Sequence, residues 1–197
     1  MGKVKIITDT ACDLTIDFLK ENGIKIVPMT INFADRSYED GFDLHRDEFY
    51  RLLAMSTKLP TTAQPTPGAF LKIMQEIMEQ GDEALVITIS TGMSGTYESA
   101  IMAQEQLKDK ERVAVFDSRT ASLGQGLLVL KAMEMAEAGL SKKEMIKELA
   151  QIRSRLFSVF TLDTLEYLQK GGRIGKVQGI MGSFLNIKPI IRVGDDG

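Results

Sequence analysis

Residues 84–96 read ALVITISTGMSGT, and this stretch decides the fold of the chain. Its first part, Ala84–Ile89, is a short apolar and β-branched run, which is typical of a buried parallel strand. Its second part, Ser90–Thr96, consists mostly of hydroxyl-bearing residues and glycines and leads into a helical pattern over Tyr97–Leu107. A buried strand that turns directly into a helix is the repeating unit of α/β proteins.

The same alternation continues in both directions along the chain. Further strands are predicted at Val4–Ile7, Ile24–Phe33, Val113–Phe116, Phe157–Leu162 and Ile187–Val193. Further helices are predicted at Leu14–Glu21, Arg46–Met55, Ala69–Gln80, Leu127–Ala138 and Thr164–Lys170, with one more that begins after Ser141 in a capping box with Glu144. The pattern predicts an α/β domain over 1–156, with a parallel sheet flanked by helices.

The chain changes character after this domain. Residues 157–197 hold more glycine and a predicted strand that Pro189 interrupts, which suits an edge strand or a different sheet. We interpret them as the start of a second, lipid-covering α+β domain that is incomplete here, because so short a segment cannot close a core alone.

The hydrophobic fraction, the net charge and the cysteine count argue against several classes of protein. A hydrophobic fraction of 44% supports a real core, and a net charge of −3 favours neither nucleic acid nor an anionic membrane as a partner. The single cysteine, Cys12, permits no internal disulfide and suits a reducing compartment. No signal peptide and no apolar window of membrane-spanning length is found, so we expect a cytoplasmic protein without stable membrane insertion.

Hydroxyl groups gather where the predicted parallel strands end, which is where open α/β sheets bind ligands. Ser94 lies just before a helix, where free backbone N–H groups attract an anion. The alternative is that Ser94 and its neighbours are ordinary helix caps. Thr61, Thr62 and Gln64 offer neutral donors on Pro60–Pro67, which is predicted to be a loop that its prolines stiffen and keep out of a helix. Arg173 can fork two bonds to a carboxylate or phosphate, or it can simply neutralise a helix C-terminus.

These segments, taken in order, resemble the signatures of the DegV family over the length of the chain. The resemblance rests on Thr8–Leu14 (TDTACDL), Pro60–Pro65 (PTTAQP), Ser90–Ala100 (STGMSGTYESA), Leu165–Gly175 (LEYLQKGGRIG) and Leu185–Ile190 (LNIKPI). It implies a long-chain fatty acid held between two domains by a protein that is not an enzyme on its own and needs no cofactor. By position, the implied ligand-binding residues are Thr62, Ser94 and Arg173, with Thr61 and Gly95 beside them.

The resemblance also implies a partner and a role in phospholipid metabolism. Members of this family are subunits of bacterial fatty acid kinase, and they present the acyl carboxylate to a separate catalytic subunit that phosphorylates it. Two departures stand out. Ala63 occupies a position where the family usually has serine, and the lone His45 does not match the histidine that the family places near the carboxylate.

Other classes of function find less support in the residues. No Gly-x-Ser-x-Gly elbow surrounds a serine, and Cys12 has no neighbouring cation in sequence to activate it. An acidic cluster at Asp35, Glu39, Asp40 and Asp43 leaves an all-carboxylate metal site open, although a solvated loop explains it equally well. A small-anion or nucleotide-dependent enzyme is the main alternative, but the sequence holds neither a dinucleotide fingerprint nor a P-loop. A pure interaction module is a third interpretation.

Overall fold

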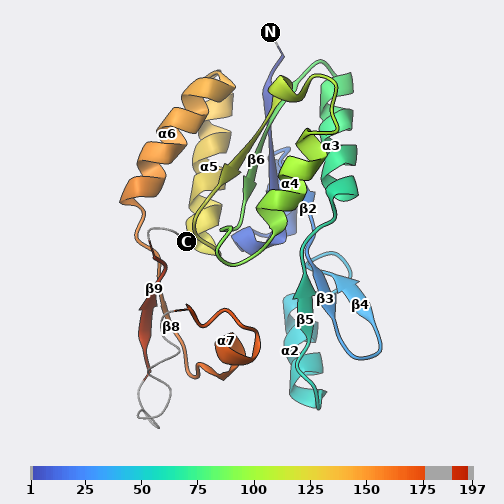
Figure 1. Ribbon diagram of the computed structural model, residues 1–197, viewed down its shortest axis with the longest axis vertical. Coiled ribbons are helices and arrows are strands. Elements are labelled where there is room, and N and C mark those ends of the chain that lie inside the picture. The colour runs from blue at the N-terminus through green and yellow to red at the C-terminus, as the bar shows by residue number, and fades with distance from the viewer. Residues whose placement is uncertain (1, 176–187, 195–197) are drawn as a thin grey trace.

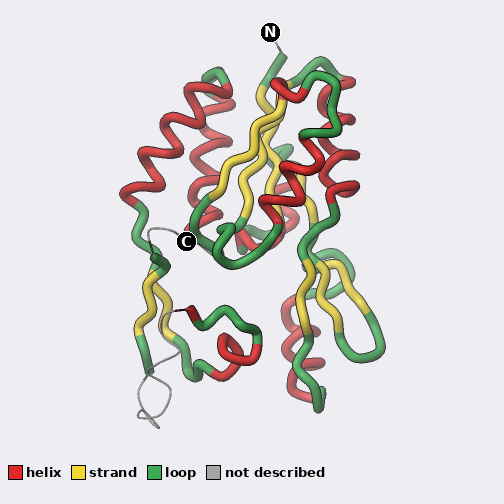
Figure 2. Tube along the Cα trace, in the orientation of Figure 1, coloured by secondary structure: helices red, strands yellow, loops and turns green. Residues whose placement is uncertain are grey.

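A sheet of four parallel strands in the order β2-β1-β6-β7 forms the centre of the molecule (Figure 1). Its strands are β1 (Val4–Asp9), β2 (Lys25–Val27), β6 (Glu83–Thr88) and β7 (Val113–Asp117). The computed structural model describes residues 2–175 and 188–194. The predicted α/β fold with a parallel sheet flanked by helices is confirmed, and Figure 2 shows the helices on either side of the strands.

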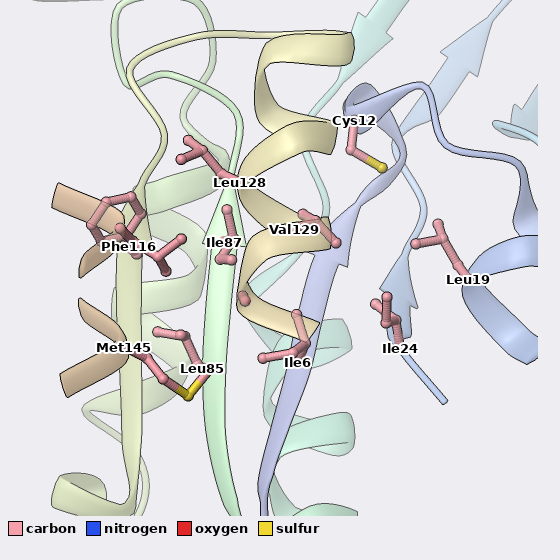
Figure 3. Packing of buried hydrophobic residues seen from close by; sticks show 12 residues of the cluster. Ile6, Cys12, Leu19, Ile24, Leu85, Ile87, Phe116, Leu128, Val129 and Met145 are labelled. Atoms are coloured by element: carbon pink, nitrogen blue, oxygen red, sulfur yellow. The ribbon is translucent and has the colours of Figure 1, made fainter. Parts of the chain in front are cut away.

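Three helices cover one face of this sheet. They are α1 (Ile16–Glu21), α5 (Leu123–Glu137) and α6 (Lys142–Arg155). Strand residues Ile6, Leu85 and Ile87 point to this face and pack against Leu128 and Met145 of the helices (Figure 3). The capping box predicted for α6 is present, because the side chains of Ser141 and Glu144 each bond the other's backbone N–H.

The opposite face carries α3 (Pro67–Glu79) and α4 (Thr96–Gln104). Here the strands contribute Ile7 and Val86, the immediate neighbours in sequence of the residues on the first face. Alternate residues of a strand point to opposite faces, so a continuous apolar run is what a sheet covered on both sides requires. This explains why Ala84–Ile89 carries no polar alternation.

A small antiparallel sheet in the order β4-β3-β5 extends from one end of the main sheet, with α2 (Arg46–Met55) beside it (Figure 1). Its strands are β3 (Thr30–Asn32), β4 (Ser37–Glu39) and β5 (Thr61–Ala63). The single strand predicted over Ile24–Phe33 is therefore wrong. Pro28 lacks the N–H that a continuous ladder needs, and the chain leaves one sheet as β2 and enters the other as β3.

The segment around Thr61 and Thr62 also differs from the prediction. It was expected to be a loop between prolines, yet Thr61–Ala63 forms β5 and pairs with β3. Pro60 and Pro65 lie outside the three paired residues, so they leave the short ladder intact.

The C-terminal part contains β8 (Val159–Thr161), α7 (Glu166–Lys170) and β9 (Ile190–Arg192). Strands β8 and β9 pair antiparallel with each other in a sheet of their own. The division into 1–156 and 157–197 as two domains stays a prediction. Two 3-10 helices complete the described elements, η1 (Thr10–Cys12) after β1 and η2 (Lys110–Arg112) before β7.

A close approach of α5 to η1 yields a test of this packing. A Cβ on Gly126 would lie 2.7 Å from the backbone oxygen of Cys12 and 3.3 Å from Cγ of Leu14. Gly126→Ala should therefore lower the free energy of unfolding by about 1–2 kcal/mol, because the clash outweighs the gain in helix propensity. The matched control is Gly68→Ala in α3, where the nearest atom is 3.9 Å away. That change should stabilise the protein by up to about 1 kcal/mol. Urea unfolding followed by circular dichroism measures both, and equal shifts would contradict the close approach.

Candidate functional site

The carboxyl ends of β1, β6 and β7 meet at one edge of the central sheet. Asp9 closes β1 and is fully buried. Its carboxylate accepts hydrogen bonds from the backbone N–H of Ile89 (2.9 Å) and of Ala11 (3.0 Å), and from Nε2 of Gln125 (3.2 Å). Burial raises the pKa of Asp9 to about 6, despite these donors. Asp9 therefore ties the end of β6 to β1 and α5.

The loop from β6 to α4, residues 89–95, is held by its own backbone and by β7. The carboxylate of Asp117 accepts from the hydroxyl (2.9 Å) and the N–H (3.3 Å) of Thr91. The N–H groups of Met93 and Ser94 both donate to the carbonyl of Ser90. These bonds fix Ser94 against the sheet without using its hydroxyl.

Ser94 does not cap α4 in the ordinary way. The N-cap is Gly95, where no side-chain cap hydrogen bond forms, and the hydroxyl of Ser94 instead lies 2.8 Å from Oγ1 of Thr96. The alternative that Ser94 is an ordinary cap is therefore wrong. The first N–H groups of α4 lack a side-chain cap, and the positive end of the helix dipole lies beside Ser94, an arrangement that favours an anion.

The segment after β5 lies across this helix start. Nε2 of Gln64 donates to Oγ of Ser99 at 3.0 Å, and a Cβ on Gly95 would collide with the amide of Gln64. Any larger residue at position 95 would force the Gln64 amide to move. In the described part of the chain the exposed hydroxyls of Thr61 and Thr62 have no hydrogen-bond partner. They lie two and three residues from Gln64 on the same segment.

Arg173 reaches the same loop from the far end of the chain. Its Nε donates to the carbonyl of Met93 at 3.3 Å, and its Nη1 donates to the carbonyl of Gly171 at 2.6 Å. The side chain is exposed, so the guanidinium retains donors for a ligand. The next residue, Ile174, is buried at 6% exposure and begins an apolar segment whose later members, Ile180, Met181, Phe184 and Leu185, lie outside the described residues.

The structure thus brings together three segments that are far apart in sequence. Ser94, Gly95 and Arg173 lie at one place, and Gln64 connects β5, with Thr61 and Thr62, to it. Among the described residues, no hydrogen bond joins either threonine to Ser94 or Arg173. Figure 1 shows β5 and α7 on the two sides of the molecule's lower half, below the β6–α4 loop. That these residues hold a ligand stays a prediction.

The remaining candidates of the sequence fall elsewhere. Cys12 is fully buried, and burial raises the pKa of its thiol to about 11, so it is the inert small side chain that was expected. His45 is the N-cap residue of α2. Over residues 2–175 and 188–194, no group of three or more His, Cys, Asp or Glu side chains could hold a metal ion. In the same ranges, no helix is long and apolar enough to cross a bilayer.

Sequence reasoning missed the buried cluster beneath the loop. Gln125 is fully buried in α5, and its Nε2 bonds both Asp9 and the hydroxyl of Thr8. The oxygen of this amide and Oγ1 of Thr88 are buried without a hydrogen-bond partner among the described residues. The signal in the sequence was a polar residue, Gln125, next to the apolar run Leu127–Leu130 of the same helix, and it does not by itself indicate a partner.

The fold and the site define a class, namely an α/β protein that gathers hydroxyls, a helix start and a guanidinium at the carboxyl edge of its sheet. A sequence model described as "Uncharacterised protein, DegV family" matches residues 3–197. The chain belongs to the DegV family. A DegV domain-containing protein of Caldanaerobacter subterraneus subsp. tengcongensis is 41% identical over 197 residues, which are 100% of this chain and 69% of that protein.

Solved structures extend this relationship. A fatty-acid-binding DegV family protein from Thermus thermophilus superposes with a TM-score of 0.90 and 35% identity, over 98% of this chain and 69% of that one. A stearic-acid-binding protein from Eubacterium ventriosum gives a TM-score of 0.89 and 34% identity, over 100% of this chain and 68% of that one. Both proteins are described as binding a fatty acid, and for the second this is stearic acid.

Proposed function

We propose that this protein binds a long-chain fatty acid, with the carboxylate held where the end of β5, the β6–α4 loop and Arg173 converge. The observation that carries the proposal is this convergence, because Gln64 and Arg173 reach the two sides of one helix start. Ser94 would supply a hydroxyl donor, the first turn of α4 its free N–H groups, and Arg173 a positive charge. Thr61 and Thr62 would add hydroxyls that have no partner in the described part of the chain.

The acyl tail and the carboxylate head group are expected to contribute differently to the free energy of binding. Burying one methylene yields about 0.8 kcal/mol, so a long acyl chain could gain on the order of 12 kcal/mol before the costs of binding are subtracted. A hydrogen bond to a charged group nets about 1.5–3 kcal/mol. The tail should therefore dominate affinity, and the head-group contacts should set the orientation. Ile174, which is buried and directly follows Arg173, would contact the first methylenes.

An exposed head group suits transfer to a partner. We propose that the carboxylate is presented to the catalytic subunit of a fatty acid kinase, where a carboxylate oxygen attacks the γ-phosphorus of ATP and ADP leaves. Thr62 and Arg173 are both exposed, so the site lies at the surface where a second protein can reach it. This chain would supply orientation, and the partner would supply the phosphoryl donor.

Identification of the co-purified ligand tests the proposal. The purified protein is extracted with organic solvent, and the extract is analysed by mass spectrometry for fatty acids and nucleotides. We expect a long-chain fatty acid in near-stoichiometric amount. Nucleotide without fatty acid would instead favour the small-anion or nucleotide-dependent enzyme. Adding the kinase subunit and ATP to the loaded protein should then yield an acyl phosphate, which hydroxylamine traps as a hydroxamate. Bound lipid that is never phosphorylated would limit the function to binding.

A further inference from the structure

A polar cavity lies at the end of β7, where Ser118 follows Asp117. Its volume is about 260 Å³. Two arginines and four hydroxyl-bearing residues line it together with backbone and apolar atoms of α6 and of the segment after β9. The polar lining residues are Ser118, Arg119, Thr120, Arg153, Ser154 and Ser158. Among the residues that the structure describes, those lining the cavity carry no carboxylate.

Arg153 is held rigidly in this cavity. Its Nη1 donates to the carbonyl of Asp117 at 2.5 Å, and its guanidinium stacks on Phe116, with 4.7 Å from Cζ to the ring centroid. Burial and the nearby positive charge of Arg119 lower the pKa of Arg153 from its ordinary value. An anion between the two guanidinium groups would relieve this repulsion.

Arg119 is held in place by its backbone while its side chain is free. The residue has φ of 52°, a left-handed conformation that is uncommon for a residue with a side chain, and its N–H donates to the carboxylate of Asp117 at 2.9 Å. Its guanidinium has no hydrogen-bond or ion-pair partner in the part of the chain that the structure describes.

One hydroxyl of the cavity is available to donate. Ser118 donates to the carbonyl of Thr120, Ser154 to the carbonyl of Gln151, and Oγ1 of Thr120 to Oγ of Ser158 at 2.9 Å, so the hydroxyl hydrogen of Ser158 remains for a ligand. The last turn of α6 contributes a partial negative charge, which two full positive charges outweigh. The carboxylate of Asp117 is engaged by Thr91 and by the N–H of Arg119. The cavity therefore offers two guanidinium groups and the hydroxyl of Ser158 together.

We propose that this cavity binds a small oxyanion of the phosphate class. Its volume is below the roughly 300–1,000 Å³ typical of sites for larger organic ligands, so an ion or a single phosphoryl group fits it better than a whole nucleotide or lipid. The forked guanidinium of arginine matches a tetrahedral oxyanion. The site shares no residue with Thr61, Thr62, Ser94, Gly95 and Arg173, so it is separate from the proposed head-group site.

Titration calorimetry of the purified protein with inorganic phosphate, in a low-salt buffer, tests the proposal. Saturable binding is expected, and Arg119→Gln should weaken it roughly tenfold or more. Arg119 is the first choice because its guanidinium has no hydrogen bond or ion pair to another described residue, so the variant should fold. Arg153→Gln should also weaken binding but removes the contact with the carbonyl of Asp117. The matched control is Arg155→Gln, an exposed arginine of the same helix outside the cavity, which should leave binding unchanged.

Each outcome decides the proposal. Absence of saturable binding would overturn the proposal. An equal loss of affinity in Arg119→Gln and Arg155→Gln would also overturn it, because binding would then depend on the net charge of the protein and not on the cavity. Parallel titration with phenyl phosphate separates two sources of the same chemistry. Equal affinity for both indicates a site open to the phosphoryl group of a larger molecule, and preference for the inorganic ion indicates a free anion; either result supports the site. Fatty-acid binding by Arg119→Gln should be unaltered.

Discussion

Replacing Arg173 with alanine is expected to weaken the binding of a long-chain fatty acid roughly 10- to 100-fold. The guanidinium is the positively charged group that donates to Met93, next to Ser94, and removing it leaves the ligand's carboxylate with the neutral donors of the proposed site. Displacement of a fluorescent fatty acid measures the affinity. The loss should be the same for fatty acids of different chain length, because the variant alters the head-group site and leaves the apolar contacts of the tail unchanged.

Two further variants control this prediction. Arg173→Lys keeps the charge but loses the forked geometry, so we expect an intermediate loss. Lys170→Ala removes a nearby cation that pairs with Glu166 instead of the loop, and it should bind normally. If the alanine variant is folded and binds with unaltered affinity, Arg173 does not belong to the site. If the loss grows with chain length, Arg173 acts on the tail rather than on the head group.

The buried carboxylate of Asp9 should make stability fall as the pH rises. Burial raises its pKa from 3.8 to about 6, so between these values the native state holds a proton that the unfolded chain has released. The free energy of unfolding then decreases with pH across this window and is constant, as far as this group is concerned, above about pH 6. A shift of roughly two pH units corresponds to about 3 kcal/mol as an upper bound. Protonation also adds a hydroxyl donor to a cluster in which Oε1 of Gln125 has no partner among the described residues.

Asp9→Asn isolates this contribution, since the amide does not titrate. Urea unfolding from about pH 4 to about pH 7 should show the wild type losing about 3 kcal/mol relative to the variant. Asp109→Asn is the matched control, because Asp109 is exposed and its side chain makes no cap hydrogen bond. Its curve should run parallel to that of the wild type. A parallel curve for Asp9→Asn as well would show that Asp9 remains ionised throughout.

Local patterns predicted most elements of the main domain, because each depends on neighbours in sequence. The apolar run before Ser90 and the capping box at Ser141 are such features, and both elements occur where expected. The prediction failed at Ile24–Phe33 and at Thr61–Ala63, where the choice of partner strand lies outside the segment. Whether residues beside Pro28 continue one sheet or enter another depends on which edges are free to pair.

The candidate site divides in the same way. The sequence by itself determined the chemistry available, namely hydroxyls at Thr62 and Ser94, a glycine at position 95 and a guanidinium at position 173. Two contacts depend on the tertiary structure, namely that of Gln64 with Gly95 and that of Arg173 with Met93. Packing helices on both faces of a parallel sheet brings distant strand ends to one edge. The burial of Asp9 beside Gln125 and the proximity of the two like-charged side chains of Arg119 and Arg153 are likewise consequences of packing. Electrostatic environment depends on distance in space, and spacing along the chain does not encode it.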